Sequence, residues 1–171
     1  NVPSHAHSCQ WLTGFIHMYL PVVARLLRQR DRWLSRQADR ALALEDRMQV
    51  RTAEPAGFDE MARSLAAGSR LRNAQMSGSI CDAILTPMPG EITFPILQRL
   101  CGAGLVVSDD EALQAMALAF QHLRIVLEPG GAVALAAALF REDLPDTVIA
   151  IGSGGNVDTA VFADSLARFG G

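Results

Sequence analysis

The sequence of 171 residues contains no lysine, and all 15 of its basic residues are arginine. A Schiff base with an aldehyde cofactor, a P-loop contact to phosphate and a lysine general base each require a primary amine on a side chain. The side chains of this sequence can supply none of these three functions.

Cysteine is scarce, and its three positions, Cys9, Cys81 and Cys101, lie far apart. No C-x-x-C pair is present, so the pattern favours neither a disulfide framework nor a zinc site. His5 and His7 precede Cys9, but a terminal cluster without a second pair of ligands does not favour a metal site. This use of cysteine predicts a cytoplasmic protein.

Net charge is also low, at −3 with a pI near 5.8. No global field would attract nucleic acid or an anionic membrane, so we expect neither as a partner. Residues 11–27 are apolar, but the stretch is short for a bilayer span, contains His17 and Pro21, and runs into several arginines. We therefore expect no membrane anchor.

The composition changes near Ala41. Residues 1–40 hold three of the four histidines, both tryptophans, the only tyrosine and six arginines. We treat 1–40 as an atypical segment and expect an amphipathic helix across residues 22–44. Half of the residues are apolar and 19% are charged, which together with the length favours one globular domain. We expect residues 41–171 to form its main part.

From Ala41 onward the sequence alternates apolar strand patterns with helical ones. The firmest helix start is Ser108, where the sequence SDDE forms a capping box before an apolar-periodic run. Asp59 and Gly68 are typical of the start and stop of another helix. The expected strands are 48–53, 105–107 and 147–151, and the expected helices are 59–65, 90–100, 108–123, 132–140 and 157–169. This order predicts an α/β fold with a doubly wound parallel sheet and helices on both faces.

Two glycine-containing segments are candidates for a ligand site. Residues 153–156 (SGGN) directly follow the expected strand 147–151, where backbone N–H groups and a helix N-terminus can face a ligand. Residues 128–131 (EPGG) put a carboxylate at the start of a buried helix. Spacing alone leaves two alternatives open, since 153–156 can be an ordinary tight turn and Glu128 a solvated turn residue.

Taken together, these segments resemble a known family. Residues 128–137 (EPGGAVALAA) followed by 153–158 (SGGNVD) are similar to the C-terminal signature of fold-type-II pyridoxal-phosphate enzymes, the serine/threonine dehydratases and serine racemases. The segments 54–60, 62–73, 79–83 and 93–96 resemble other parts of that family in the same order. The resemblance extends from about Ala41 to Gly171 and implies part of the tryptophan-synthase-β-like fold.

The resemblance implies roles for particular residues. Ser153 would hydrogen-bond the pyridine nitrogen of pyridoxal phosphate, while Gly154, Gly155 and Asn156 would shape the turn around the ring. Glu128 would lie near the same ring edge. Several members of the family also hold a divalent cation, and the matching ligands in this sequence are Glu54, the carbonyl of Phe58, and Glu60. Oxygen ligands of this kind suit Mg²⁺ or Ca²⁺, although Asp59 and Glu60 can equally be first-turn acids that complement a helix dipole.

Two features of the family are missing. The family's Schiff-base lysine lies in an N-terminal half that has no counterpart here, and residues 28–40 contain no glycine for a phosphate-binding loop. We expect a chain derived from an ammonia-lyase that acts on a hydroxy amino acid but is inactive alone, joined to an unrelated leader by a frameshift, truncation or rearrangement. The alternative is a non-catalytic, partner-dependent or vestigial subunit. In either case we expect a homo-oligomer, or association through an exposed sheet edge.

Overall fold

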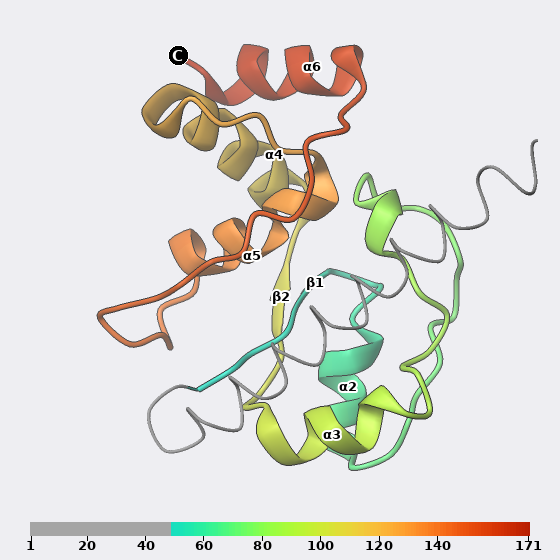
Figure 1. Cartoon of the computed structure of the whole chain (residues 1–171). Coiled ribbons are helices and arrows are strands. Elements are labelled where there is room, and N and C mark those ends of the chain that lie inside the picture. The colour runs from blue at the N-terminus through green and yellow to red at the C-terminus, as the bar shows by residue number, and fades with distance from the viewer. Residues whose placement is uncertain (1–48) are drawn as a thin grey trace, which may run out of the picture. The chain divides into compact units, whose positions relative to one another are not determined.

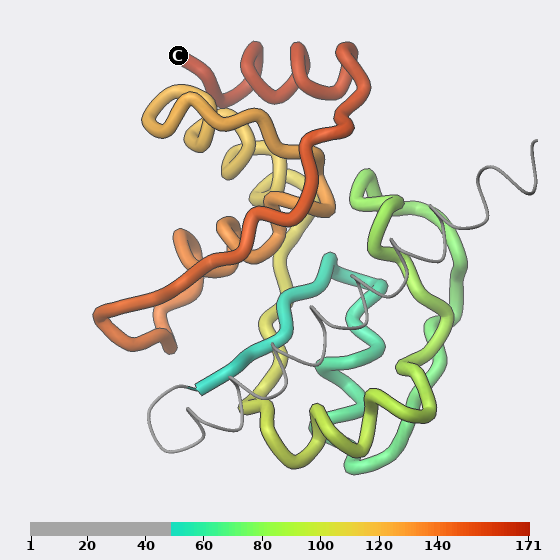
Figure 2. The backbone as a smooth tube through the Cα atoms, in the orientation of Figure 1, coloured from blue at the N-terminus to red at the C-terminus, as the bar shows by residue number. Residues whose placement is uncertain are grey.

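The computed structural model describes residues 49–171 (Figures 1 and 2). The expected helix across 22–44, the atypical segment 1–40 and the apolar stretch 11–27 lie outside the described residues. None of the described helices is long and apolar enough to cross a membrane.

The sheet of the described unit consists of two parallel strands, β1 (Ala53–Pro55) and β2 (Leu105–Val107). Ala53 is the register partner of Leu105, and Pro55 is that of Val107. The strand at 105–107 is confirmed. The strand expected at 48–53 instead lies at 53–55. Within the expected range, Val50 makes only an isolated bridge to Cys101, and regular pairing begins at Ala53 and Leu105.

Helices account for most of the remaining regular structure. They are α2 (Glu60–Ala67), α3 (Thr93–Leu100), α4 (Asp109–Leu118), α5 (Pro129–Phe140) and α6 (Thr159–Phe169), with short turns η1 (Asp82–Ile84) and η2 (Ala119–Leu123, a π-helix). The capping box of α4 is confirmed, since Ser108 Oγ accepts from Glu111 N at 3.2 Å and the Glu111 carboxylate accepts from Ser108 N at 2.7 Å. Helix α2 ends at Gly68 as expected, with φ at +69°.

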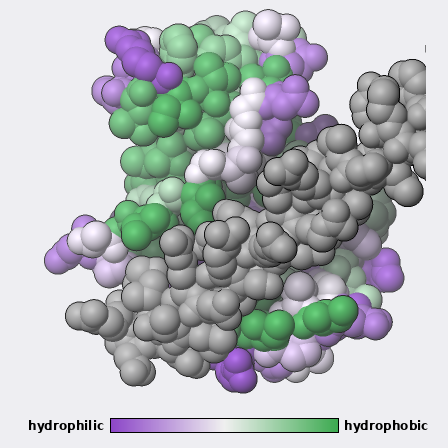
Figure 3. All heavy atoms as spheres, viewed as in Figure 1, coloured by the Kyte–Doolittle hydropathy of each residue, from purple (hydrophilic) through white to green (hydrophobic). Residues whose placement is uncertain are grey.

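The core lies where α5 packs against both strands and against α4, which in turn packs against α6. Figure 1 shows α5 to one side of the strands and α2 with α3 to the other. The fully buried side chains include Met116 of α4, Val133 of α5 and Val107 of β2. Ser165 of α6 is also buried, and its hydroxyl donates to the Leu113 carbonyl at 2.9 Å. In the view of Figure 3, hydrophobic residues gather over this group of helices.

The expected central strand 147–151 is wrong for this structure. Its residues join no ladder, and Ile149 is 77% exposed. A central parallel strand needs a hydrogen-bonded neighbour on each side, and the sheet of the described unit contains only β1 and β2. The α/β class and the parallel arrangement are confirmed, while the extent of the sheet is smaller than the apolar runs predicted.

Candidate cofactor site

The two glycine-containing segments meet in space. Glu128 N, directly before α5, donates a hydrogen bond of 2.9 Å to the Gly154 carbonyl. Gly131, in the first turn of α5, lies so close that a Cβ there would be 2.5 Å from Gly154 O and 2.8 Å from Gly154 N. The turn 152–156 therefore rests on the first turn of α5, and the contact depends on a residue without a side chain at position 131.

Glu128 directs its carboxylate at the same turn. Its backbone is extended (φ −79°, ψ 162°) and its side chain makes no capping bond to α5. The carboxylate instead fills the space that a side chain on Gly154 would need. Gly155 is held equally close, since a Cβ there would be 2.8 Å from the Val126 carbonyl oxygen. Two of the five predicted cofactor-binding residues, Glu128 and Gly154, are thus in direct contact, and Gly155 packs against the residue two before Glu128.

Ser153 and Asn156 of this turn are both exposed. Within residues 49–171, neither side chain forms a hydrogen bond to the protein. The Ser153 hydroxyl and the Asn156 amide are therefore open to a ligand. The N-cap of α6 is Asp158, not Asn156, and its carboxylate accepts a hydrogen bond from Ala160 N at 2.7 Å. The cofactor-binding roles of Ser153, Gly154, Gly155, Asn156 and Glu128 stay predictions.

A second acidic group surrounds the start of α2. Glu54, on β1, accepts from Met61 N at 2.9 Å and from Ala62 N at 2.7 Å, one bond to each carboxylate oxygen. It therefore caps α2 in place of Asp59, which is the residue at the N-cap but makes no capping bond. Burial raises the pKa of Glu54 to about 7, and the nearby charges of Glu60 and Asp59 act in the same direction, while the two N–H groups oppose them.

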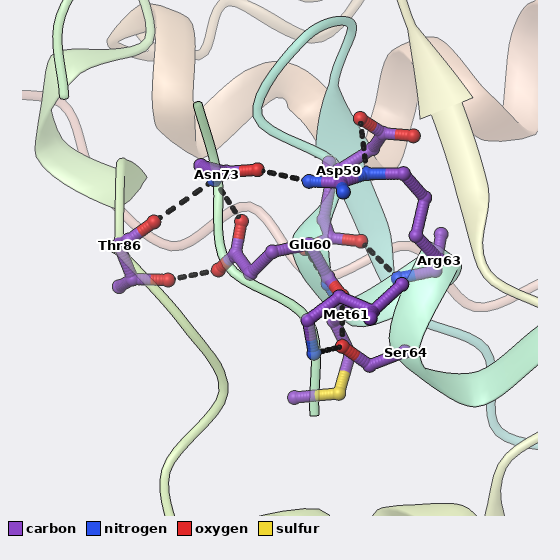
Figure 4. Close-up of polar contacts among 10 residues, drawn as sticks. Asp59, Glu60, Met61, Arg63, Ser64, Asn73 and Thr86 are labelled. Atoms are coloured by element: carbon purple, nitrogen blue, oxygen red, sulfur yellow. Dashed lines mark hydrogen bonds and ion pairs between the residues drawn. The ribbon is translucent and has the colours of Figure 1, made fainter. Parts of the chain in front are cut away.

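Glu60 is only 4% exposed and is held by neutral donors (Figure 4). Asn73 Nδ2 donates to one of its carboxylate oxygens at 2.6 Å, and the Thr86 hydroxyl donates to the other. The same Asn73 amide also reaches the Thr86 carbonyl at 2.9 Å, and Arg63 donates to Asn73 Oδ1. Spacing gave no signal for Asn73 or Thr86, because each lies in a long irregular connection.

The three predicted metal ligands lie in and directly before the start of α2, but they include few charged groups. Phe58 is buried, and its N–H donates to the Pro55 carbonyl at 3.0 Å. Across residues 49–171 no group of three or more His, Cys, Asp or Glu side chains is arranged to hold a metal ion. The set of Glu54, the Phe58 carbonyl and Glu60 has two carboxylates only, and its role as a cation site stays a prediction.

Comparison with known proteins identifies the family. The family model for pyridoxal-phosphate-dependent enzymes matches residues 37–156. The chain belongs to this family. The resemblance inferred from residues 128–137 and 153–158 is therefore confirmed.

Relatives of known activity agree with this assignment. The chain is 37% identical to serine racemase of Dictyostelium discoideum over 132 residues, which are 74% of this chain and 40% of that enzyme. It is 34% identical to phenylserine dehydratase of Ralstonia pickettii over 126 residues, covering 72% of this chain and 38% of that enzyme. The chain thus spans about 40% of the length of the curated relatives it matches.

Solved structures of similar enzymes show the same fold over about the same part of this chain. The threonine deaminase from T.th. superposes with a TM-score of 0.65 at 38% identity, covering 71% of this chain and 42% of that enzyme. Serine racemase of Dictyostelium discoideum gives a TM-score of 0.60 at 36% identity, covering 69% of this chain and 38% of that enzyme. These likenesses confirm a partial α/β fold of the pyridoxal-phosphate type.

Proposed function

We propose that this chain forms the Ser153 side of a pyridoxal-phosphate site in an enzyme that acts on a hydroxy amino acid such as serine or threonine, as an ammonia-lyase or racemase. The observation that carries the proposal is the direct contact between Glu128 and the 152–156 turn. It supports the proposal because the Glu128 carboxylate lies against Gly154, the residue next to the exposed Ser153. The activities of the relatives, serine racemase and phenylserine dehydratase, support the substrate class.

The residues of this chain suit hydrogen bonding to the ring of pyridoxal phosphate but not its covalent attachment. The exposed Ser153 hydroxyl fits a partner of the pyridine nitrogen, a position from which a protein tunes the electron withdrawal of the ring. Covalent attachment does not fit, because the sequence contains no lysine. No catalytic step therefore follows from this chain alone, and a lysine-bearing segment, in the same protein or a companion chain, completes the site in this proposal.

Activity measurements test this proposal. We expect the purified chain alone to convert neither L-serine nor L-threonine. We expect turnover to appear when the chain is mixed with the part of Dictyostelium discoideum serine racemase that it does not cover, in the presence of pyridoxal phosphate. Ser153→Ala should then lower turnover by about tenfold or more, whereas Ser69→Ala, at an exposed site next to the end of α2, should leave it unchanged.

The competing function is a non-catalytic or vestigial subunit, which the absence of lysine also favours. The same assay separates the two. A mixture that assembles and binds pyridoxal phosphate without consuming either amino acid supports the non-catalytic subunit. Turnover by the pure chain contradicts both proposals.

A divalent cation is a second component of the proposal. Glu54 and Glu60 repel one another near the start of α2 and have only neutral donors as hydrogen-bond partners among residues 49–171. Each carboxylate oxygen can accept a further partner, so Mg²⁺ or Ca²⁺ at Glu54, the Phe58 carbonyl and Glu60 would offset this repulsion. Calorimetric titration with CaCl₂ or MgCl₂ should show binding that is lost in Glu54→Gln and kept in Glu91→Gln. A titration without heat for either ion would exclude the site.

A further inference from the structure

Asp109 is the acidic residue of the SDDE motif that has a partner outside α4 and no part in the capping box. The cap of α4 is made by Ser108 and Glu111. Asp109, at the first position of the helix, accepts a hydrogen bond of 2.6 Å from the Ser79 hydroxyl and one of 3.1 Å from Ile80 N, one at each carboxylate oxygen. Hydrogen bonds to an ionised carboxylate are stronger than those between neutral groups. The carboxylate therefore attaches a segment from much earlier in the chain to the start of α4.

The attached segment is the turn 79–84, which includes η1. Cys81 N donates to Ser79 Oγ at 3.1 Å, so the hydroxyl that binds Asp109 also closes the turn. Cys81 is fully buried in the core, whereas Ala83, two residues later, is exposed. The turn is thus fixed on its core side and presents Ala83 at the surface.

The turn 79–84 packs against the first turn of α5. A Cβ on Gly130 would lie 3.6 Å from the Ala83 Cβ. A Cβ on the next residue, Gly131, would instead meet the turn 152–156. Successive residues of an α-helix point about 100° apart around its axis. The two turns therefore flank the first turn of α5 on different sides.

We propose that Asp109 is a positioning residue of the pyridoxal-phosphate site. By holding the turn 79–84 against the first turn of α5, it keeps Glu128 and the turn 152–156 in the arrangement that receives the cofactor ring. This inference rests on the proposed function, and Asp109 acts in it through Ser79 rather than by contact with the cofactor. The competing role is a purely structural one, in which Asp109 only complements the dipole of α4.

Three variants separate the two roles. Asp109→Ala removes both acceptors. Asp109→Asn keeps the shape of the side chain, because its amide oxygen can accept from Ile80 N while its amide nitrogen donates to Ser79 Oγ. Asp110→Ala is the matched control, since it removes the same charge from the same end of α4. The Asp110 carboxylate pairs instead with Arg168 of α6, at 2.7 Å.

Hydrogen exchange on the full chain gives the first readout. The amide of Glu128, which donates to the Gly154 carbonyl, reports on the site, and the amide of Met116, within α4, reports on overall stability. Asp109→Ala should speed exchange at Glu128 by about tenfold or more relative to Met116, while Asp109→Asn and Asp110→Ala should keep this ratio within about threefold of the original chain. An equal increase at both amides in Asp109→Ala, or no increase, would show a purely structural role and overturn the inference.

Binding of pyridoxal phosphate gives the second readout. It is measured by cofactor fluorescence in the mixture with the part of Dictyostelium discoideum serine racemase that the chain does not cover. Asp109→Ala should raise the Kd by about fivefold or more, and Asp109→Asn should restore it. An unchanged Kd in Asp109→Ala, or an equal rise in Asp110→Ala, would overturn the inference. If the mixture with the original chain binds no pyridoxal phosphate, the proposed function fails, and the exchange ratio still decides whether Asp109 positions the turn.

Discussion

At the scale of single residues, the acidic group at the start of α2 illustrates how a predicted ligand can also have a structural role. Glu60 is the only buried acidic side chain among residues 49–171, and Asn73 and Thr86 satisfy its two oxygens. Ser64, one turn later, is fully buried and connects the Glu60 carbonyl, at 2.5 Å, to Leu71 N, at 2.8 Å. These bonds attach the irregular connection after α2 to the helix itself.

Removing Asn73 should therefore be costly. Asn73→Ala leaves a buried carboxylate without one of its donors, and we expect the free energy of unfolding to fall by about 2 kcal/mol. Chemical denaturation measures the change. The control is Asn156→Ala, at an exposed amide without a protein partner among the described residues, which should change stability by less than about 0.5 kcal/mol. Equal effects of the two substitutions would contradict the role given to Asn73.

Cysteine reactivity gives a second test at this scale. Burial raises the pKa of the fully buried Cys81 thiol to about 11, and the thiolate is the reactive form. At pH 8 in the folded protein, iodoacetamide should therefore modify Cys81 far more slowly than the partly exposed Cys101. Peptide mapping before and after denaturation measures this. Equal labelling of both cysteines in the folded chain would show that the core around Cys81 is open.

The sequence identified the acidic residues at the start of α2 but not all of their contacts. The resemblance to the family pointed to Glu54 and Glu60, yet the capping of α2 by Glu54 requires β1 to end beside the helix. Spacing along a helix carries no such information, because the partner comes from another element. The same reason explains why Asn73 and Thr86 were missed.

At the scale of elements, the contact of α5 with the turn 152–156 depends on Gly131. A methyl group there would meet the Gly154 backbone, which cannot move aside as a flexible side chain can. The neighbouring Gly130 differs, since a Cβ on it would meet only side chains, with the Ile84 methyl carbon nearest at 3.2 Å. The pair of glycines thus offers a matched comparison within one helical turn.

We expect Gly131→Ala to separate α5 from the turn and to lower the free energy of unfolding by about 1 to 3 kcal/mol. Gly130→Ala should change it by less than about 1 kcal/mol, because better helix propensity offsets the tighter packing. Thermal and chemical denaturation of both variants measure the difference. A Gly131→Ala protein as stable as Gly130→Ala would contradict the close contact.

The elements that sequence predicted best are those with local signals. The capping box at Ser108 and the glycine at the end of α2 depend on residues close in the chain, and both are confirmed. The strand at 147–151 failed because its structure depends on partners far away in the sequence. Its apolar β-branched composition reports a preference for burial, which the described residues leave unmet.

At the scale of the whole molecule, the chain combines part of the family fold with a sequence that contains no lysine. It holds one side of the proposed site, the Ser153 turn against Glu128, and spans about 40% of its relatives. The absence of lysine was readable from the sequence and predicts dependence on another segment. The exposure of Val148, Ile149 and Ile151, by contrast, is visible only in the structure.

Borohydride reduction of the purified chain after addition of pyridoxal phosphate, followed by peptide mass analysis, tests the central claim most directly. Without a primary amine on any side chain, no internal residue should carry a reduced cofactor adduct. An adduct on an internal residue of this chain would contradict the account.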